Sequence, residues 1–119
     1  SSKEVREIAA IVNLNTPANQ KIGNYRLTEW NPKHAMLFYS NRVLDRSITR
    51  DSEELIQQLA TNPAKTWLTS MGEFRKLADQ YPNKVYLIKA NSKYAFFTSI
   101  KNQENISYDF SDMRLPIVK

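Results

Sequence analysis

Residues 65–90 read KTWLTSMGEFRKLADQYPNKVYLIKA and contain a strand, a helix and a second strand in that order. Ser70, followed three residues later by Glu73, forms a capping box, which predicts that the helix begins there. The inner face of this helix repeats at helical spacing, with Phe74, Leu77, Ala78 and Tyr81. Residues 84–90 (KVYLIKA) are apolar on both faces, which predicts a central strand in a sheet covered on both sides.

The same alternation extends in both directions along the chain. Helical spacing predicts helices over residues 2–13, 31–39 and 51–59, and strands are predicted over residues 21–27, 42–48 and 94–100. The last of these strands follows a turn at 91–93, so we expect it to pair antiparallel with 84–90. The pattern predicts a three-layer α/β/α sandwich with a mostly parallel sheet of about four or five strands and a C-terminal antiparallel hairpin.

The length of 119 residues is enough for one hydrophobic core. We therefore expect a single α/β domain over residues 1–119, with an irregular tail or edge strand at 101–119. No apolar run approaches the roughly 18 to 20 residues that span a bilayer, and no signal peptide is visible. The first residue is Ser1 rather than Met, and this start favours a piece of a larger protein over a processed product.

The net charge of +5 raises the question of a nucleic-acid or anionic-membrane partner. The basic residues are scattered, and neither an RNP-type aromatic motif nor a zinc-finger spacing accompanies them. No nucleic-acid partner is therefore expected. An anionic membrane surface stays possible, because modest and spread positive charge is enough to favour it.

The sequence carries no catalytic constellation of its own. His34 is the only histidine and there is no cysteine, so a multi-His or Cys-based metal site is excluded, and no cofactor is expected. Gly23 and Gly72 are the only glycines, and neither belongs to a phosphate-binding loop. Asp51 and Glu54 match a helix cap better than the paired carboxylates of a glycoside hydrolase.

One loop and short helix combine the residue types that bind sugars or phosphates. Aromatic side chains flank the Asn31-Pro32 helix start, and the region contains Tyr25, His34, Tyr39 and Arg42. Aromatic rings stack on sugars, and an arginine can form bidentate hydrogen bonds to a phosphate. These four residues are the candidate substrate-binding residues. Ordinary helix packing is the alternative explanation for the aromatic rings, and the residues alone favour it.

The order of segments adds a family resemblance. The segments that carry the resemblance cover most of residues 2–100. They are KIGNYRL (21–27), KHAMLFYSNRVLD (33–45), DSEELIQQL (51–59) and the strand–helix–strand ending. This order resembles the soluble C-terminal domain of membrane glycosyltransferases of the protein-mannosyltransferase and aminoarabinose-transferase type. The most specific part is LFYSNRV (37–43), which is similar to a family segment of the form apolar-Phe-Tyr-x-x-Arg-apolar.

The resemblance implies a role outside the chemical step. Such enzymes carry many transmembrane helices and transfer a sugar from a polyprenyl-phosphate carrier on the extracytoplasmic side. Their catalytic acidic residues lie in a loop near the N-terminal membrane region, which this chain lacks. The chain would be a non-catalytic periplasmic domain that caps the active site or orients the acceptor or the lipid-linked sugar donor. Its partner would be the membrane region of the same polypeptide, with Tyr39 and Arg42 as motif residues and His34 and Tyr25 as their neighbours.

Two other function classes remain to be weighed. The alternative is a stand-alone, Rossmann-like binding or regulatory module for an anionic ligand, against which the scarcity of glycine argues. A small independent hydrolase is disfavoured, because no nucleophile-elbow motif places a serine.

Overall fold

The computed structural model describes residues 2–28, 34, 37 and 44–101. Its centre is a five-stranded sheet in the order β2-β1-β3-β5-β4. The strands are β1 (Ile22–Tyr25), β2 (Leu44–Thr49), β3 (Trp67–Ser70), β4 (Tyr86–Ala90) and β5 (Tyr94–Thr98). β1, β4 and β5 lie within predicted strand segments, whereas β2 and β3 each continue one residue beyond the predicted ends at residues 48 and 69.

The sheet is mixed rather than mostly parallel, so that prediction is wrong. β1 pairs in parallel with β2 and with β3, whereas β5 pairs antiparallel with both β3 and β4. The physical reason is the short turn after β4, which returns the chain as β5 into the position between β3 and β4. The C-terminal antiparallel hairpin is confirmed.

The strand KVYLIKA does not take the central position expected of it. Among the described strands, β4 lies at the edge of the sheet and β3 lies at its centre. β4 is nevertheless covered on both sides, because Leu87 joins the hydrophobic cluster on one face and Ile88 packs against the cluster on the other. Two covered faces, and not a central position, explain its apolar sequence.

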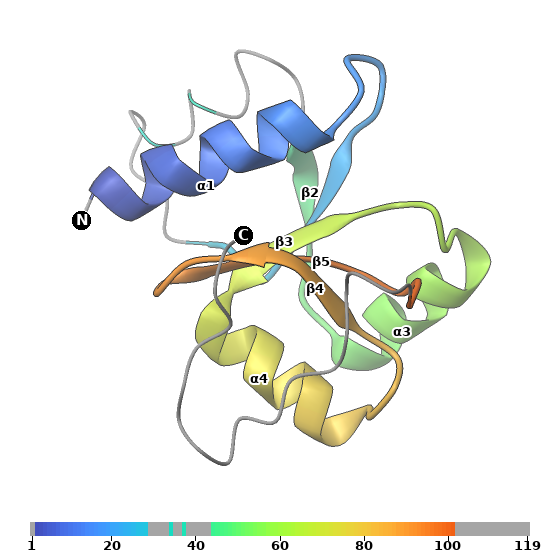
Figure 1. The fold of residues 1–119 in the computed structure, drawn as a ribbon. Helices are drawn as coiled ribbons and strands as arrows, with labels where there is room; N and C mark the ends of the chain where they lie inside the picture. Colours follow the sequence, from blue (N-terminus) through green and yellow to red (C-terminus); the bar gives the residue numbers. More distant parts are fainter. Residues whose placement is uncertain (1, 29–33, 35–36, 38–43, 102–119) are drawn as a thin grey trace.

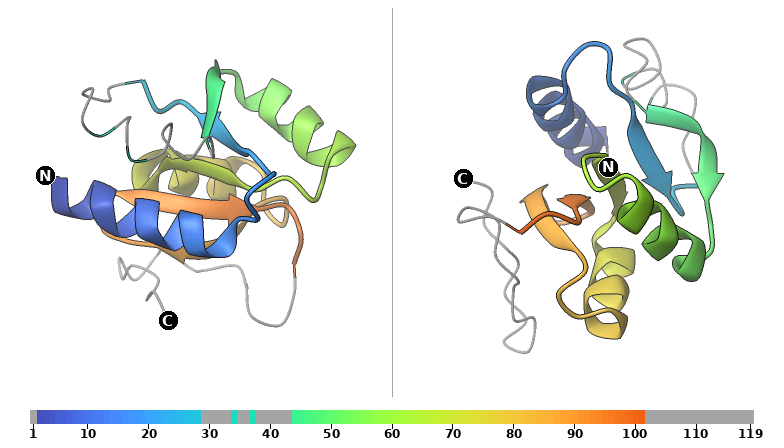
Figure 2. Two further views of the ribbon diagram at one scale, coloured as in Figure 1. Left: turned by 90° about the horizontal axis from the view of Figure 1, so that it is seen from above. Right: turned by 90° about the vertical axis from the view of Figure 1, so that its right-hand side faces the viewer.

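Helices cover both faces of the sheet (Figures 1 and 2). The helix α1 (Ser2–Asn15) lies on one face and buries Val5, Ile8, Ala9 and Val12 against side chains of the sheet. The helices α3 (Ser52–Thr61) and α4 (Met71–Gln80) lie on the opposite face, with Leu55, Leu59, Phe74 and Leu77 in a second cluster. Of the predicted inner face of α4, Phe74 and Leu77 are buried, and Ala78 and Tyr81 are partly buried against the same cluster.

The helix ends follow the predicted capping chemistry. The carboxylate of Asp51 accepts a hydrogen bond from the backbone N–H of Glu54 at 3.1 Å, and the hydroxyl of Ser70 accepts one from that of Glu73 at 3.1 Å. Both groups satisfy donors that a helix N-terminus leaves without a partner. α1 continues to Asn15, beyond the predicted end at residue 13.

Two predictions fall largely outside the described residues. Of the helix predicted over 31–39, only His34 and Leu37 are described, and both are helical. Leu37 packs against the α1-side cluster. Of the tail predicted over 101–119, only Lys101 is described, and it is exposed.

A close contact joins the parallel and antiparallel parts of the sheet. Gly23 of β1 is in register with Trp67 of β3, whose side chain is 1% exposed. A Cβ atom on Gly23 would collide with the Cε3, Cδ2 and Cζ3 atoms of the Trp67 ring. The absence of a side chain at Gly23 therefore lets the indole lie directly on the neighbouring strand.

Candidate functional site

The chain reverses its direction of travel across the sheet between β1 and β3. The strand that follows β1 lies on one side of it, whereas the strand that follows β3 lies on the other. In open α/β sheets, ligands bind outside the carboxyl ends of the strands at such a switch point. The residues that follow β1 and β3 are therefore the candidate position for a site.

The turn after β1 is held by the side chain of Asn24. This buried amide accepts a hydrogen bond from the backbone N–H of Leu27 at 2.9 Å and donates one to the carbonyl of Leu27 at 3.2 Å. Within this turn Arg26 has φ = 59°, in the left-handed region that a residue with a Cβ rarely adopts. Strained backbone of this kind persists only where its surroundings fix it, and it clusters at functional sites.

The side chain of Arg26 has partners on three elements. Its Nε donates to the carbonyl of Arg50 at 2.6 Å, at the end of β2. Its Nη1 lies 3.1 Å from Oε2 of Glu73, in the first turn of α4. Its guanidinium carbon lies 5.1 Å from the centre of the Tyr25 ring. We call Tyr25, Arg26, Ser70 and Glu73, together with the backbone carbonyl of Arg50, the switch-point cluster.

One carboxylate and two cations meet in and beside the cluster. The Glu73 carboxylate contacts both Arg26 and Lys76, the latter at 3.4 Å. Burial raises the pKa of the Tyr25 phenol, an effect that the positive charge of Arg26 opposes and the negative charge of Glu73 reinforces. The hydroxyl of Thr69 donates to the carbonyl of Tyr25 at 2.7 Å and ties the ends of β1 and β3 together. Tyr25 is therefore a neutral, buried aromatic at neutral pH.

The hydrogen bond and the ion pair of Arg26 tie the end of β1 to the end of β2 and to the start of α4. Arginine recognises carboxylates and phosphates, and here a carboxylate of the same chain already occupies it. Within the described ranges, no group of three or more His, Cys, Asp or Glu side chains is placed to hold a metal ion. The cluster is a partly exposed internal ion pair at the position where other α/β domains bind anions.

The four candidate substrate-binding residues are not brought together by the described part of the chain. Tyr25 belongs to the switch-point cluster, but its ring is 1% exposed and packs in the core on the α3 and α4 side. His34 is half-buried and lies at a helical position of the connection between β1 and β2. Tyr39 and Arg42 lie outside the described residues.

Sequence reasoning missed Arg26 and Asn24. The signal available was an asparagine inside an otherwise apolar strand followed by an arginine at the strand's end. Such an asparagine must have its amide bonded if it is buried. Neither the left-handed backbone of Arg26 nor its ion pair with Glu73, far along the chain, is visible in the residue pattern.

None of the described helices is both long enough and apolar enough to cross a membrane. Comparison of the chain with protein-family models, with curated protein sequences and with solved structures finds no match.

Proposed function

We propose that this chain is a non-catalytic extramembrane domain of a membrane glycosyltransferase that uses a polyprenyl-phosphate sugar. In this proposal the domain lies on the extracytoplasmic side, where it caps the active site or orients the acceptor or the donor. The transfer chemistry belongs to the membrane region of the same polypeptide. The proposal rests on the resemblance carried by residues 37–43 and on the nature of the switch-point cluster.

The internal ion pair of the switch-point cluster is the observation that supports this function best. A Rossmann-like domain that binds an anion presents backbone N–H groups from a glycine-rich turn after its first strand. Here the corresponding turn contains Arg26, which is bonded to the Arg50 carbonyl and to Glu73. Because Nε and Nη1 of Arg26 already have internal partners, an anionic ligand would have to compete with them, so the alternative of a stand-alone anion-binding module is less well supported.

The position of the motif segment in the topology is a second support. Residues 26–43 form the connection that leaves the carboxyl end of β1, and Arg42 precedes the first residue of β2 by two positions. Connections between strands carry binding residues more often than the strands themselves, because the scaffold holds them at its surface. Tyr39 and Arg42 are the residues proposed to contact the membrane region or its lipid-linked substrate.

The first test reads the coding sequence upstream of Ser1. The proposal expects a long hydrophobic region with many membrane spans directly before this domain. A start of translation or a soluble enzyme domain at that place would contradict it.

The second test measures sugar transfer by the full-length protein in membranes. We expect Arg42→Ala and Tyr39→Phe to lower the transfer rate by roughly tenfold or more, because a misplaced substrate group loses orientation. Arg50→Ala is the matched control, since it removes an exposed arginine whose described hydrogen bond uses only the backbone carbonyl. Unchanged rates for both motif variants in a folded protein would remove these residues from the proposal.

The third test separates the proposed domain from an anion-binding module. Saturating nucleotides or sugar phosphates would raise the melting temperature of such a module in proportion to the logarithm of ligand concentration over Kd. We expect no such shift for this chain. A saturable shift that disappears in Arg26→Gln would favour the alternative function.

A further inference from the structure

The domain has one end at which lysines and exposed apolar side chains occur together. β1, β3 and β4 begin at this end, and the antiparallel β5 ends there. α1 ends there as well, because its first turn lies at the opposite end, where Asn91 donates to the carbonyl of Glu4 at 2.9 Å. We call this the basic end; it contains Leu14, Lys21, Lys65, Lys84, Ile100 and Lys101.

Among the described residues, the basic end carries four lysines against two aspartates, Asp45 and Asp79. Lys21, Lys84 and Lys101 are exposed, and Lys65 is bonded to Asp45 at 2.6 Å. Asp79, near the end of α4, is the one other described acidic residue close to this end. The first turns of α1, α3 and α4 each carry acidic residues at the other end of the molecule.

The exposed apolar side chains gather at the same end. Leu14, in the last turn of α1, is 86% exposed, and Ile100, next to Lys101, is 47% exposed. They are the two large exposed hydrophobic side chains of the described residues. Either alone would be ordinary, since single apolar residues are common on protein surfaces. Their joint occurrence with the lysines needs an explanation.

We infer that the basic end is a contact surface for an anionic lipid bilayer. Lysines keep their charged heads among lipid phosphates while their stems and neighbouring Leu or Ile side chains enter the headgroup boundary. Protein interfaces instead favour arginine and aromatic residues and are depleted in lysine. Surfaces that bind single-stranded nucleic acid add aromatic platforms for the bases. The composition of this end therefore matches lipid best.

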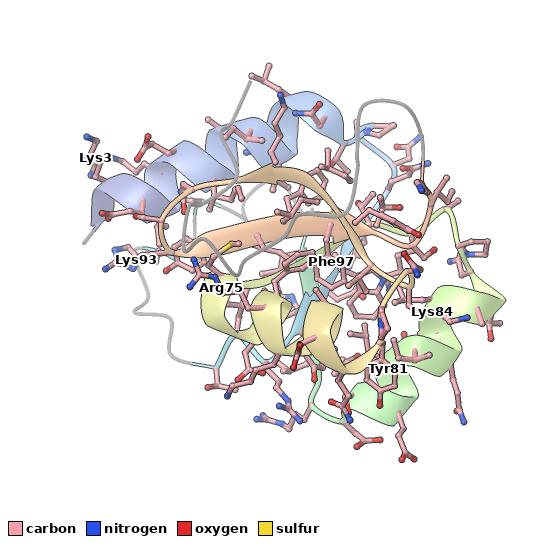
Figure 3. All side chains as sticks on the ribbon, turned by 60° about the horizontal axis from the view of Figure 1, so that its bottom comes forward. Lys3, Arg75, Tyr81, Lys84, Lys93 and Phe97 are labelled. Carbon is pink, nitrogen blue, oxygen red and sulfur yellow. The ribbon has the colours of Figure 1, made fainter. Side chains whose placement is uncertain are left out.

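Figure 3 shows the contrast that the experiment uses: Lys84 lies at one end of the molecule, and Lys3 and Lys93 lie at the other. Lys3, Arg50 and Lys93 are also exposed. Replacing these three by glutamine changes the net charge by the same amount as replacing Lys21, Lys84 and Lys101. The two variants then lose the same net charge at different ends of the molecule.

The test measures sedimentation of the chain with phosphatidylcholine vesicles that contain about a third phosphatidylglycerol. We expect binding that weakens with salt and is much weaker to pure phosphatidylcholine. Each lysine near an anionic surface contributes about a fivefold gain in affinity, so the Lys21→Gln, Lys84→Gln, Lys101→Gln variant should bind roughly a hundredfold more weakly. The matched variant at the other end should keep most of its affinity.

A double variant tests how much the apolar side chains contribute to vesicle binding. Leu14→Ser with Ile100→Ser should weaken vesicle binding even at high salt, where the electrostatic part is screened. Circular dichroism checks that every variant is folded.

Three results would each overturn the inference. The first is no binding to anionic vesicles, and the second is an equal loss of affinity in both triple-glutamine variants. The third is binding to soluble polyanions that is as tight as vesicle binding and is unchanged by Leu14→Ser with Ile100→Ser. This lipid contact goes beyond the proposed function and does not depend on it. The vesicle experiment can fail while sugar transfer still responds to Arg42, and the reverse can also occur.

Discussion

We call the pairing of β1 with β3, where Gly23 contacts Trp67, the seam. Gly23→Ala tests whether this seam depends on direct contact with the indole ring. The added methyl would collide with three atoms of the Trp67 ring. The ring cannot move away freely, because Trp67 is buried among the residues of the α3 and α4 side. Overpacking a rigid core costs typically 1 to 3 kcal/mol, and a collision with a large buried ring places this variant near about 3 kcal/mol.

That loss is large against the roughly 5 to 15 kcal/mol that stabilises a typical domain. It corresponds to a fall in melting temperature of about 10 °C for a domain of this size. Urea unfolding followed by circular dichroism and by tryptophan fluorescence measures it. The double variant Gly23→Ala with Trp67→Leu should show a favourable coupling energy, because the smaller side chain leaves room for the methyl.

Gly72→Ala is the matched control for the same chemical change. Nothing lies within 4 Å of a Cβ at Gly72, in the first turn of α4. Alanine is the better helix former, so this variant should be more stable than the parent by about 0.5 to 1 kcal/mol. Equal effects at the two glycines, or an unchanged stability in Gly23→Ala, would refute the reasoning about the seam.

Three further changes test other parts of the fold by equilibrium unfolding. Asp51→Ala removes the cap of α3 and should lower the free energy of unfolding by about 1 kcal/mol. Glu53→Ala leaves that cap intact and should lower it clearly less, so similar losses in the two variants would count against the cap. Asn24→Ala leaves the buried N–H and carbonyl of Leu27 without these partners and should cost about 1 to 3 kcal/mol; a neutral result would mean that water or a rearranged turn replaces the amide. Burial raises the pKa of Tyr25 above its ordinary value of 10.0, so the unfolded chain ionises first and stability falls as the pH rises through 10. Tyr25→Phe should therefore lose less stability than the parent between about pH 8 and about pH 11, and an identical pH dependence would contradict the burial of that phenol.

Local signals predicted most of the fold. Helix caps and helical periodicity depend only on residues close together in the chain, so they can be predicted from the sequence. This applies to the caps at Asp51 and Ser70 and to the buried faces of α1, α3 and α4. The position of β5 depends on which strand its hairpin inserts against, and no local pattern encodes that choice. The sheet was therefore expected to be mostly parallel, and β4 was expected at its centre.

The candidate site was harder to predict for the same reason. Tyr25 was singled out as a ligand contact, yet its ring is buried in the core. Arg26 and Glu73 meet only after the chain has crossed the sheet, and they are 47 residues apart. Pairing over such a distance is a property of the topology rather than of any motif.

The seam at Gly23 and Trp67 also has a consequence for how the chain folds. β3, α4, β4 and β5 follow one another within residues 67–98, so their strand pairings join residues at most 30 positions apart. Joining β1 to β3 brings together residues such as Tyr25 and Thr69, which are 44 positions apart, and longer loops cost more entropy to close. We therefore expect the antiparallel part to form first and the seam to close late. Gly23→Ala should then speed unfolding far more than it slows refolding.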